Sequence, residues 1–277
     1  MEPAMEPTAA PSTSHAHDET AAQSPEPTPP EEASRRSRII STVLSPAVRL
    51  WLRSQVEQVE ALEFRIEGGD RQLLSGHIPQ VIISASKAVY QGLHLSQVQM
   101  VGRNIRVNLG QMLRGKPLRL LAVVPIRGEV VIQQADLNAS LHAPMLATAL
   151  AEFLAELLRS QLSPGLSESS EPQKLTLQNP SVTIGNHRIT LVADLLTASG
   201  RLIPVAIRTG MQVMNGNLLC LEHPQWLPHP RAKRGLPLND LHGFQVDLGS
   251  DVDLEELSLE DERIICRGGI NVIPVTP

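Results

Sequence analysis

Three groups of residues in this sequence have types and spacings that could support chemistry, and the first nearly matches a phosphate-binding loop. The segment from Gly110 to Pro117 (GQMLRGKP) begins with the Gly-x4-Gly-Lys pattern whose backbone amides hold phosphate. Such a loop needs a hydroxyl group after the lysine to bind magnesium, and it must lead from a strand into a helix. Pro117 has no hydroxyl group, and a strand-like segment follows it. The pattern therefore predicts a turn between two strands.

The second group could bind a metal ion. Cys220, His223 and His229 have C-x2-H-x5-H spacing, but a structural zinc site usually has four ligands at tighter spacing. The acidic run from Asp247 to Glu256 lacks the glycine that an EF-hand calcium loop requires. We therefore expect ordinary loop histidines and a strand with an acidic outer face. The sequence predicts no metal site, no cofactor and no catalytic residue, although a triad built from distant residues stays open.

The third group consists of basic residues that could meet an anionic surface. Arg114, Lys116 and Arg119 surround the turn described above, and a second cluster (RAKR) spans 231–234. A basic residue close to an anionic membrane contributes about 1 kcal/mol of binding free energy. Solvated loops explain both clusters equally well. We take Arg114, Lys116 and Arg119 as the candidate head-group residues.

Composition and charge restrict the possible partners. Hydrophobic residues make up 42% of the chain and aromatic residues only 2%, so the core must be aliphatic. The net charge is −5, and residues 1–38 carry −4 of it, which leaves a nearly neutral body that does not favour nucleic-acid binding. Residues 1–38 contain no Leu, Ile, Val or aromatic residue, which predicts a disordered, acidic, Pro-rich tail and shows no secretory signal. Without a membrane-spanning run, we expect a cytoplasmic protein, with peripheral membrane contact as a further expectation.

Two helices would position an apolar surface. Apolar residues recur at helical spacing around Leu44, Val48 and Trp51, and Pro46 suits the first turn, which predicts a helix over about 46–59. A second apolar stripe, which includes Met145, Ala149 and Phe153, predicts a helix that begins near Asp136. These faces could pack as core or could line a cavity for acyl chains.

The remaining segments read as consecutive strands. Ile105, Val107 and Leu109 alternate with polar residues, which is typical of a half-buried strand. Further strands are predicted throughout 62–133, including Leu118–Val124, and throughout 174–272. Strands that follow one another without intervening helices favour antiparallel meanders. We predict an α+β fold over 39–277, a single domain whose two β-rich halves are joined by a linker near 160–173. Cys220 and Cys266 are expected to be buried thiols, with a disulfide left open.

The strand region also carries a recognisable motif string. LSGxIPxVxxSAxxAVYxGL begins at Leu74, NIRxNL and LRGKPLRLL follow it, and DLNAS spans Asp136–Ser140. This string resembles the LmeA-like phospholipid-binding family over about 39–275. That family is similar to the tubular lipid-binding superfamily. The resemblance implies a strongly curved antiparallel sheet wrapped around long apolar helices and enclosing a groove.

The implied function is non-catalytic binding, and in a finer form transfer, of a phospholipid or another acyl lipid. Candidate groove residues are Leu44, Val48, Trp51, Ile105, Val107, Leu109, Met145, Ala149 and Phe153. The alternative is a structural or adaptor protein with a filled core, whose acidic tail recruits a partner.

Overall fold

The computed structural model describes residues 44–161, 176–196, 200–241 and 244–274. All of them belong to one of two units of the chain, residues 36–277. The tail expected at 1–38, and most of the linker expected near 160–173, lie outside the described residues.

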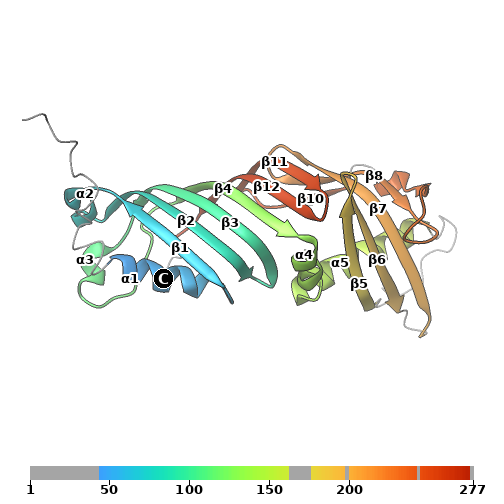
Figure 1. The fold of residues 1–277 in the computed structure, drawn as a ribbon, viewed down its shortest axis with the longest axis horizontal. Coiled ribbons are helices and arrows are strands. Elements are labelled where there is room, and N and C mark those ends of the chain that lie inside the picture. The colour runs from blue at the N-terminus through green and yellow to red at the C-terminus, as the bar shows by residue number, and fades with distance from the viewer. Residues whose placement is uncertain (1–43, 162–175, 197–199, 242–243, 275–277) are drawn as a thin grey trace, which may run out of the picture. The chain divides into compact units, whose positions relative to one another are not determined.

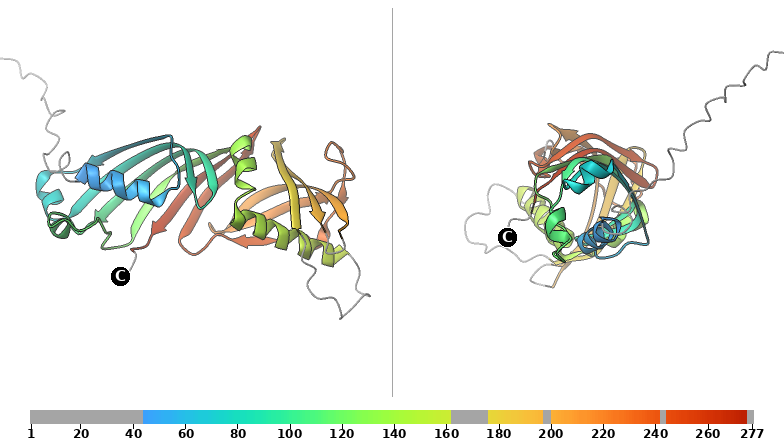
Figure 2. Two further views of the ribbon diagram at one scale, coloured as in Figure 1. Left: turned by 90° about the horizontal axis from the view of Figure 1, so that it is seen from below. Right: turned by 90° about the vertical axis from the view of Figure 1, so that its left-hand side faces the viewer.

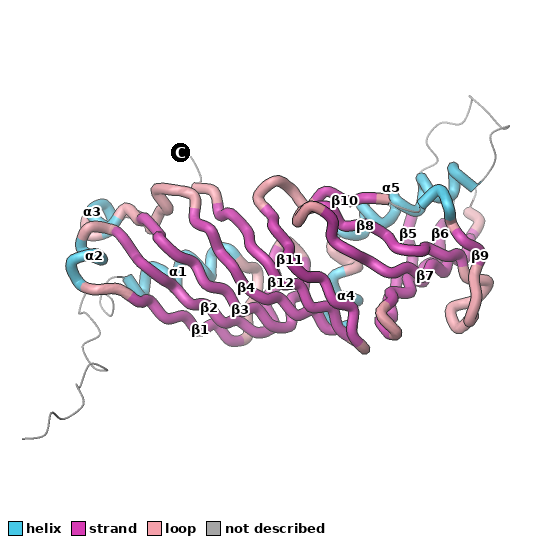
Figure 3. Tube along the Cα trace, turned by 90° about the horizontal axis from the view of Figure 1, so that it is seen from above, coloured by secondary structure: helices cyan, strands magenta, loops and turns pink. Residues whose placement is uncertain are grey.

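Six antiparallel strands form the first sheet, in the spatial order β1, β2, β3, β4, β12, β11 (Figures 1 and 3). Their bounds are β1 Ala61–Glu67, β2 His77–Tyr90, β3 Leu93–Arg106, β4 Val124–Gln133, β11 Val252–Glu260 and β12 Arg263–Val272. The first four strands follow one another along the chain. Strands β11 and β12 come from its C-terminal part and join the sheet because β12 pairs with β4.

The second sheet is also antiparallel and has the order β10, β8, β7, β6, β5, with the short β9 beside β8. Its bounds are β5 Thr176–Gly185, β6 Arg188–Leu196, β7 Leu202–Met214, β8 Leu218–Trp226, β9 Leu236–Pro237 and β10 Gln245–Asp247. The predicted α+β class, dominated by antiparallel strands, is confirmed. The strands form two sheets where one curved sheet was expected, because alternation within a strand does not specify which distant strand pairs with it.

The helices are few and short. They are α1 Ser45–Gln55, α2 Asp70–Leu74, α3 Leu109–Met112, α4 Gln134–Ser140 and α5 Pro144–Gln161, with a 3-10 turn at Asn239–Leu241. Helix α1 has 11 residues and ends earlier than predicted, because Gln58 instead forms a β-bridge with Val89. The helix predicted from near Asp136 is divided into α4 and α5. Pro144 disfavours a helical conformation at the residue before it, which explains the break.

One predicted strand is wrong. The sequence favours a strand over Leu118–Val124, but β4 begins only at Val124. The side chain of Asn108 explains the loop, since its Nδ2 donates to the carbonyl oxygen of Pro117 at 3.0 Å. Its Oδ1 accepts from the backbone N–H of Arg119 at 2.7 Å. Leu120 still forms an isolated antiparallel bridge with Val107, so the segment pairs at one point and Asn108 supplies partners beside it.

Two apolar clusters form the core. The first cluster packs α1, α2 and α3 against one face of the first sheet, which curls around α1 (Figure 2). The second cluster joins α4 and α5 to the second sheet and to the adjoining ends of β11 and β12. Each cluster is aliphatic apart from a few aromatic side chains, as the composition requires.

Candidate functional site

The face of the first sheet that carries α1, called the inner face here, is apolar across all six strands. Strand pairing aligns residues in rows that run from β1 to β11. Three adjacent rows contain only apolar residues: Leu62-Ala85-Val98-Val130-Cys266-Leu257, Phe64-Ile83-Met100-Gly128-Gly268-Leu254 and Ile66-Val81-Gly102-Ile126-Ile270-Val252.

The opposite, outer face carries charge over the same strands. Arg267 forms ion pairs with Glu129 at 2.6 Å and with Glu256 at 2.7 Å, so that β4, β12 and β11 are joined by alternating charges. Arg127 pairs with Glu255 in the same region. Exposed pairs of this kind contribute little to stability, but they keep this face in contact with water. Of these two described faces, the inner one therefore offers the continuous apolar surface for a ligand.

Helix α1 covers one end of the inner face. Leu44 is fully buried, Val48 is 7% exposed and Trp51 packs against them. Arg49, on the other side of the helix, lies over the Phe64 ring with its guanidinium carbon 5.7 Å from the ring centroid. The apolar spacing of the helix thus turns its candidate groove residues onto the sheet.

The candidate residues Ile105, Val107 and Leu109 lie in the same first cluster, between 3% and 8% exposed. Leu109 belongs to α3, since β3 ends at Arg106. The structure therefore brings six of the nine predicted groove residues together. Four of them line, with their neighbours, an almost entirely apolar cavity of about 50 Å³: Val48, Trp51, Ile105 and Val107.

The cavity is small for a lipid. Binding pockets for small molecules usually measure about 300–1,000 Å³. A volume of about 50 Å³ between α1 and the sheet accommodates a few atoms only. An acyl chain could enter this end of the inner face only if α1 moved outward.

Beyond α1, the inner face is less completely covered. Ala85, Met100 and Val130 are half-buried, although their rows connect the first cluster with the second. A large apolar surface that remains partly open is informative, because soluble proteins seldom leave one uncovered. Cys266 lies in the same row as Ala85 and Val130, and burial raises the pKa of its thiol to about 11. Both Cys266 and Cys220 are free thiols.

The candidate head-group residues lie on the loop that follows α3. Arg114, Lys116 and Arg119 are all exposed. Leu113 and Leu121 on the same loop are each 61% exposed. Two other residues of this loop, Leu118 and Leu120, line the apolar cavity. The loop therefore presents basic and apolar side chains together at the end of the sheet that α1 covers.

The other predicted groove residues belong elsewhere. Phe153 on α5 packs into the second cluster, with its ring centroid 5.0 Å from that of Phe244. Ala149 is exposed, and the side chain of Met145 lies outside the described residues. Among the side chains that the structure describes, none from the apolar stripe of α5 lines the cavity beneath α1.

Helix α4 carries a polar contact set that sequence reasoning missed. Lys87 Nζ donates to the two carboxylate oxygens of Asp136 at 3.1 and 2.8 Å, and Ser96 Oγ donates to the same carboxylate. Asn138 Nδ2 donates to the carbonyl oxygen of Val182 at 2.9 Å, and its Oδ1 accepts from the Val182 N–H at 2.7 Å. Helix α4 is thus tied to the first sheet by Asp136 and to β5 by Asn138. The DLNAS motif was the signal, and its role here is structural.

The carboxyl group of Asp136 is electrostatically favoured in its charged form. Burial alone would raise its pKa, but the hydrogen bonds from Lys87 and Ser96, with the charge of Lys87, outweigh burial. The pKa of Asp136 is therefore held below its ordinary value of 3.8. An ionised Asp136 at neutral pH keeps both hydrogen bonds in place.

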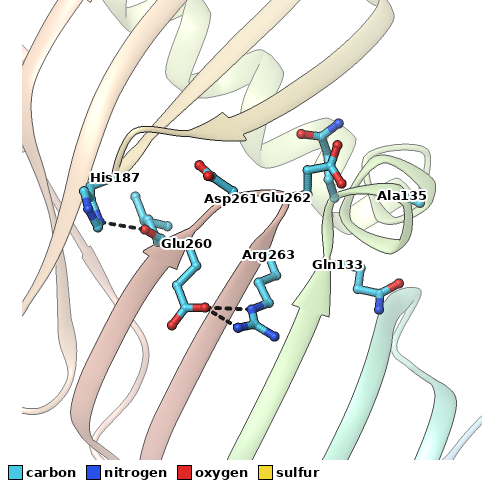
Figure 4. A pocket seen from close by; sticks show the side chains of 9 residues that line it. Gln133, Ala135, His187, Glu260, Asp261, Glu262 and Arg263 are labelled. Atoms are coloured by element: carbon cyan, nitrogen blue, oxygen red, sulfur yellow. Dashed lines mark hydrogen bonds and ion pairs between the residues drawn. The ribbon is translucent and has the colours of Figure 1, made fainter.

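A polar pocket of about 770 Å³ lies beside the turn between β11 and β12 (Figure 4). Within it, Glu260 is paired with Arg263, and His187 Nδ1 is 3.0 Å from the carbonyl oxygen of Leu259 (Figure 4). The labelled carboxylates of Glu260 and Asp261 do not converge with His187 on a common point. Across the described ranges, no three His, Cys, Asp or Glu residues are arranged to hold a metal ion. None of the helices in those ranges is both long and apolar enough to span a membrane.

These features define a two-sheet antiparallel protein with a broad, partly open apolar face and no converging set of reactive groups in the part described. Comparison with protein families agrees with that class. The chain belongs to the LmeA-like phospholipid-binding family, whose model matches residues 36–269. No curated protein and no solved structure matched the chain.

Proposed function

We propose that this protein binds phospholipid without catalysing a reaction, with the acyl chains on the inner face of the first sheet. The supporting observation is the set of three apolar rows that cross six strands, in which Ala85, Met100 and Val130 stay half-buried. Membership of a phospholipid-binding family supports the same proposal. A curved sheet that shelters acyl chains is also what similarity to the tubular lipid-binding superfamily implies.

Helix α1 acts as a movable cover in this proposal. Its side chains Val48 and Trp51, with Leu44 just before the helix, fill the end of the inner face and leave about 50 Å³ unoccupied. An acyl chain has the same preference for apolar surroundings as these side chains, so it can replace them when α1 swings outward. The loss of protein contacts is offset by the contacts with lipid.

The head group is placed at the loop after α3. Arg114, Lys116 and Arg119 would contact the phosphate, and the exposed Leu113 and Leu121 would enter the interface of an anionic membrane. Peripheral contact of this loop with a membrane would let lipid pass between bilayer and inner face. Transfer of lipid is thus a consequence of the proposal that can be measured separately.

The first test measures lipid directly. Native mass spectrometry and organic extraction of the purified full chain should reveal bound phospholipid. Met100→Glu places a charge on the half-buried inner face and should weaken lipid binding at least about tenfold. Gln99→Glu places the same charge one residue away on the outer face and should leave binding unchanged. If Met100→Glu fails to fold, Met100→Trp, which adds bulk without charge, replaces it in the lipid-binding measurement.

The second test locates the acyl chain. The chain has two tryptophans, so Trp226→Phe leaves Trp51 as the sole fluorophore. Phospholipid with brominated acyl chains should quench Trp51, since Trp51 lines the cavity beneath α1. Binding without quenching would place the lipid elsewhere.

The small cavity gives the adaptor alternative its one specific support. In that case the purified protein would contain no lipid and would ignore phospholipid vesicles. That pair of results would overturn the lipid proposal and favour a filled core with a protein partner.

A further inference from the structure

A basic pocket lies on the outer face of the second sheet, away from the inner face of the first. It has a volume of about 590 Å³, within the range of sites for small molecules. Its lining includes four cationic side chains from two strands and one loop: Arg188, Arg208, Arg231 and Lys233. None of the described residues that line it is acidic.

Strand pairing builds the floor of this pocket. Thr183 on β5 pairs with Thr190 on β6, and Thr190 pairs with Arg208 on β7. Two hydroxyl groups and a guanidinium group therefore lie side by side across three strands. The opposite faces of these strands pack into the second cluster, so the row faces outward.

Arg208 is held in one position. Its Nε donates to Thr190 Oγ1 at 3.2 Å, and its Nη1 donates to the carbonyl oxygen of Ala232 at 2.9 Å. The side chain is half-buried and has no carboxylate within ion-pair distance in the described part of the chain. A fixed, uncompensated guanidinium group is a good partner for an oxyanion, since little ordering is lost when the ligand binds.

The loop before β9 completes the pocket. Ala232 is 7% exposed and packs with Ala206 and Leu227 onto the sheet. Its neighbours Arg231 and Lys233 are exposed on either side of this anchor. The loop thus brings two further cations to the rim above Arg208.

The charge balance around the pocket favours an anion. Asp261 approaches the β5–β6 turn, with its Oδ1 3.4 Å from the backbone nitrogen of Asn186, but it belongs to the neighbouring polar pocket. Four cations with two threonine hydroxyl groups match the several acceptor oxygens of a phosphate group.

We propose that this pocket is a binding site for a phosphate group, carried either by a small phosphate monoester or by a lipid head group. The site goes beyond the lipid-binding surface proposed above, because it lies on a different sheet and has a polar lining. A phosphate bound here would contact Arg208 at the floor and Arg231 and Lys233 at the rim.

The test removes the two rim cations together. Arg231→Gln/Lys233→Gln should weaken binding of inorganic phosphate and of glycerol 3-phosphate about tenfold for each charge, measured by calorimetry at low salt. Both side chains are exposed, so the fold should be retained. The matched control, Arg65→Gln/Arg103→Gln, removes the same charge from strands of the first sheet and should change binding by less than about twofold.

A second arm identifies the source of the phosphate. Vesicles containing phosphatidic acid are compared with neutral vesicles, using the same variants. If Arg231→Gln/Lys233→Gln weakens binding only to the phosphatidic acid vesicles, the site is assigned to a lipid head group. If the same variant weakens binding of soluble phosphate, the site is assigned to the phosphate group itself. If Arg231→Gln/Lys233→Gln behaves like the control in both arms, the proposal is wrong. Met100→Glu should leave phosphate titration unchanged, which separates this site from the acyl-chain surface.

Discussion

Removing the side chain of Asn138 should loosen the junction between α4 and β5. In the native structure this amide donates to the carbonyl oxygen of Val182 at 2.9 Å and accepts from the Val182 N–H at 2.7 Å. Val182 is only 5% exposed, so water has little access to either backbone group. Asn138→Ala leaves both groups without a partner.

The magnitude follows from those two groups. A buried backbone donor or acceptor left unpaired costs about 1–3 kcal/mol. The higher helix propensity of alanine returns roughly 0.5 kcal/mol in α4. We expect the free energy of unfolding to fall by about 3 kcal/mol, and Tm to fall by about 6–12 °C for a domain of this size.

Urea and thermal denaturation, followed by circular dichroism, measure the effect. Asn271→Ala is the control, since Asn271 is exposed at the end of β12, and it should change stability by less than about 0.5 kcal/mol. Asn138→Asp keeps the acceptor for the Val182 N–H but sets a carboxylate against a carbonyl oxygen, so it should also destabilise. A loss in Asn138→Ala no larger than in the control would refute the assigned role of this amide.

Three further predictions concern single residues. Asp136→Asn should destabilise the protein at neutral pH. The folded pKa of Asp136 lies below its unfolded value, so the stability that this carboxylate contributes is present above about pH 4 and is lost as pH falls through the folded pKa. The free energies of unfolding of wild type and variant should therefore converge in acid. Gly128→Ala should cost about 2 kcal/mol or more, because the new Cβ would overlap the backbone oxygen of Gln99 on β3. Gly110→Ala, with no atom within 4 Å of the new Cβ, should be neutral or stabilising in the same urea titration. Alkylation of Cys266 at pH 8, located by mass spectrometry, should be slow, because with a pKa of about 11 roughly one thiol in a thousand is ionised. The alkylation rate should rise about tenfold per pH unit up to pH 10. A rate at pH 8 equal to that of the unfolded chain would contradict this expectation.

Local patterns in the sequence predicted much of the local structure. The strands predicted throughout 174–272 include β7, whose alternate residues Val205 and Ile207 are buried in the second cluster. The apolar spacing around Val48 identified α1 and the face that it buries. Such patterns succeed because one periodicity, 3.6 or 2 residues, places one set of side chains on one face.

The arrangement of the strands could not be predicted in the same way. The apolar rows depend on the pairing of β4 with β12, whose members Val130 and Cys266 are far apart in the sequence. Leu118–Val124 has strand-like composition, but it forms only an isolated bridge at Leu120, and the side chain of Asn108 holds the backbone of Pro117 and Arg119 in a loop. The basic pocket required the register that sets Thr190 beside Arg208. Each feature depends on long-range contacts that alternation does not encode.

The DLNAS part of the motif string and the surface proposed to bind lipid consist of different residues. Asp136, Asn138 and Ser140 make specific hydrogen bonds that hold α4, and each bond requires one side-chain type at one position. The inner face requires only that each position be apolar, since acyl chains offer no directional groups. A recognisable motif is therefore expected at the junction around α4, whereas selection among lipids should depend on the charged loops, where Lys116 and Arg119 lie.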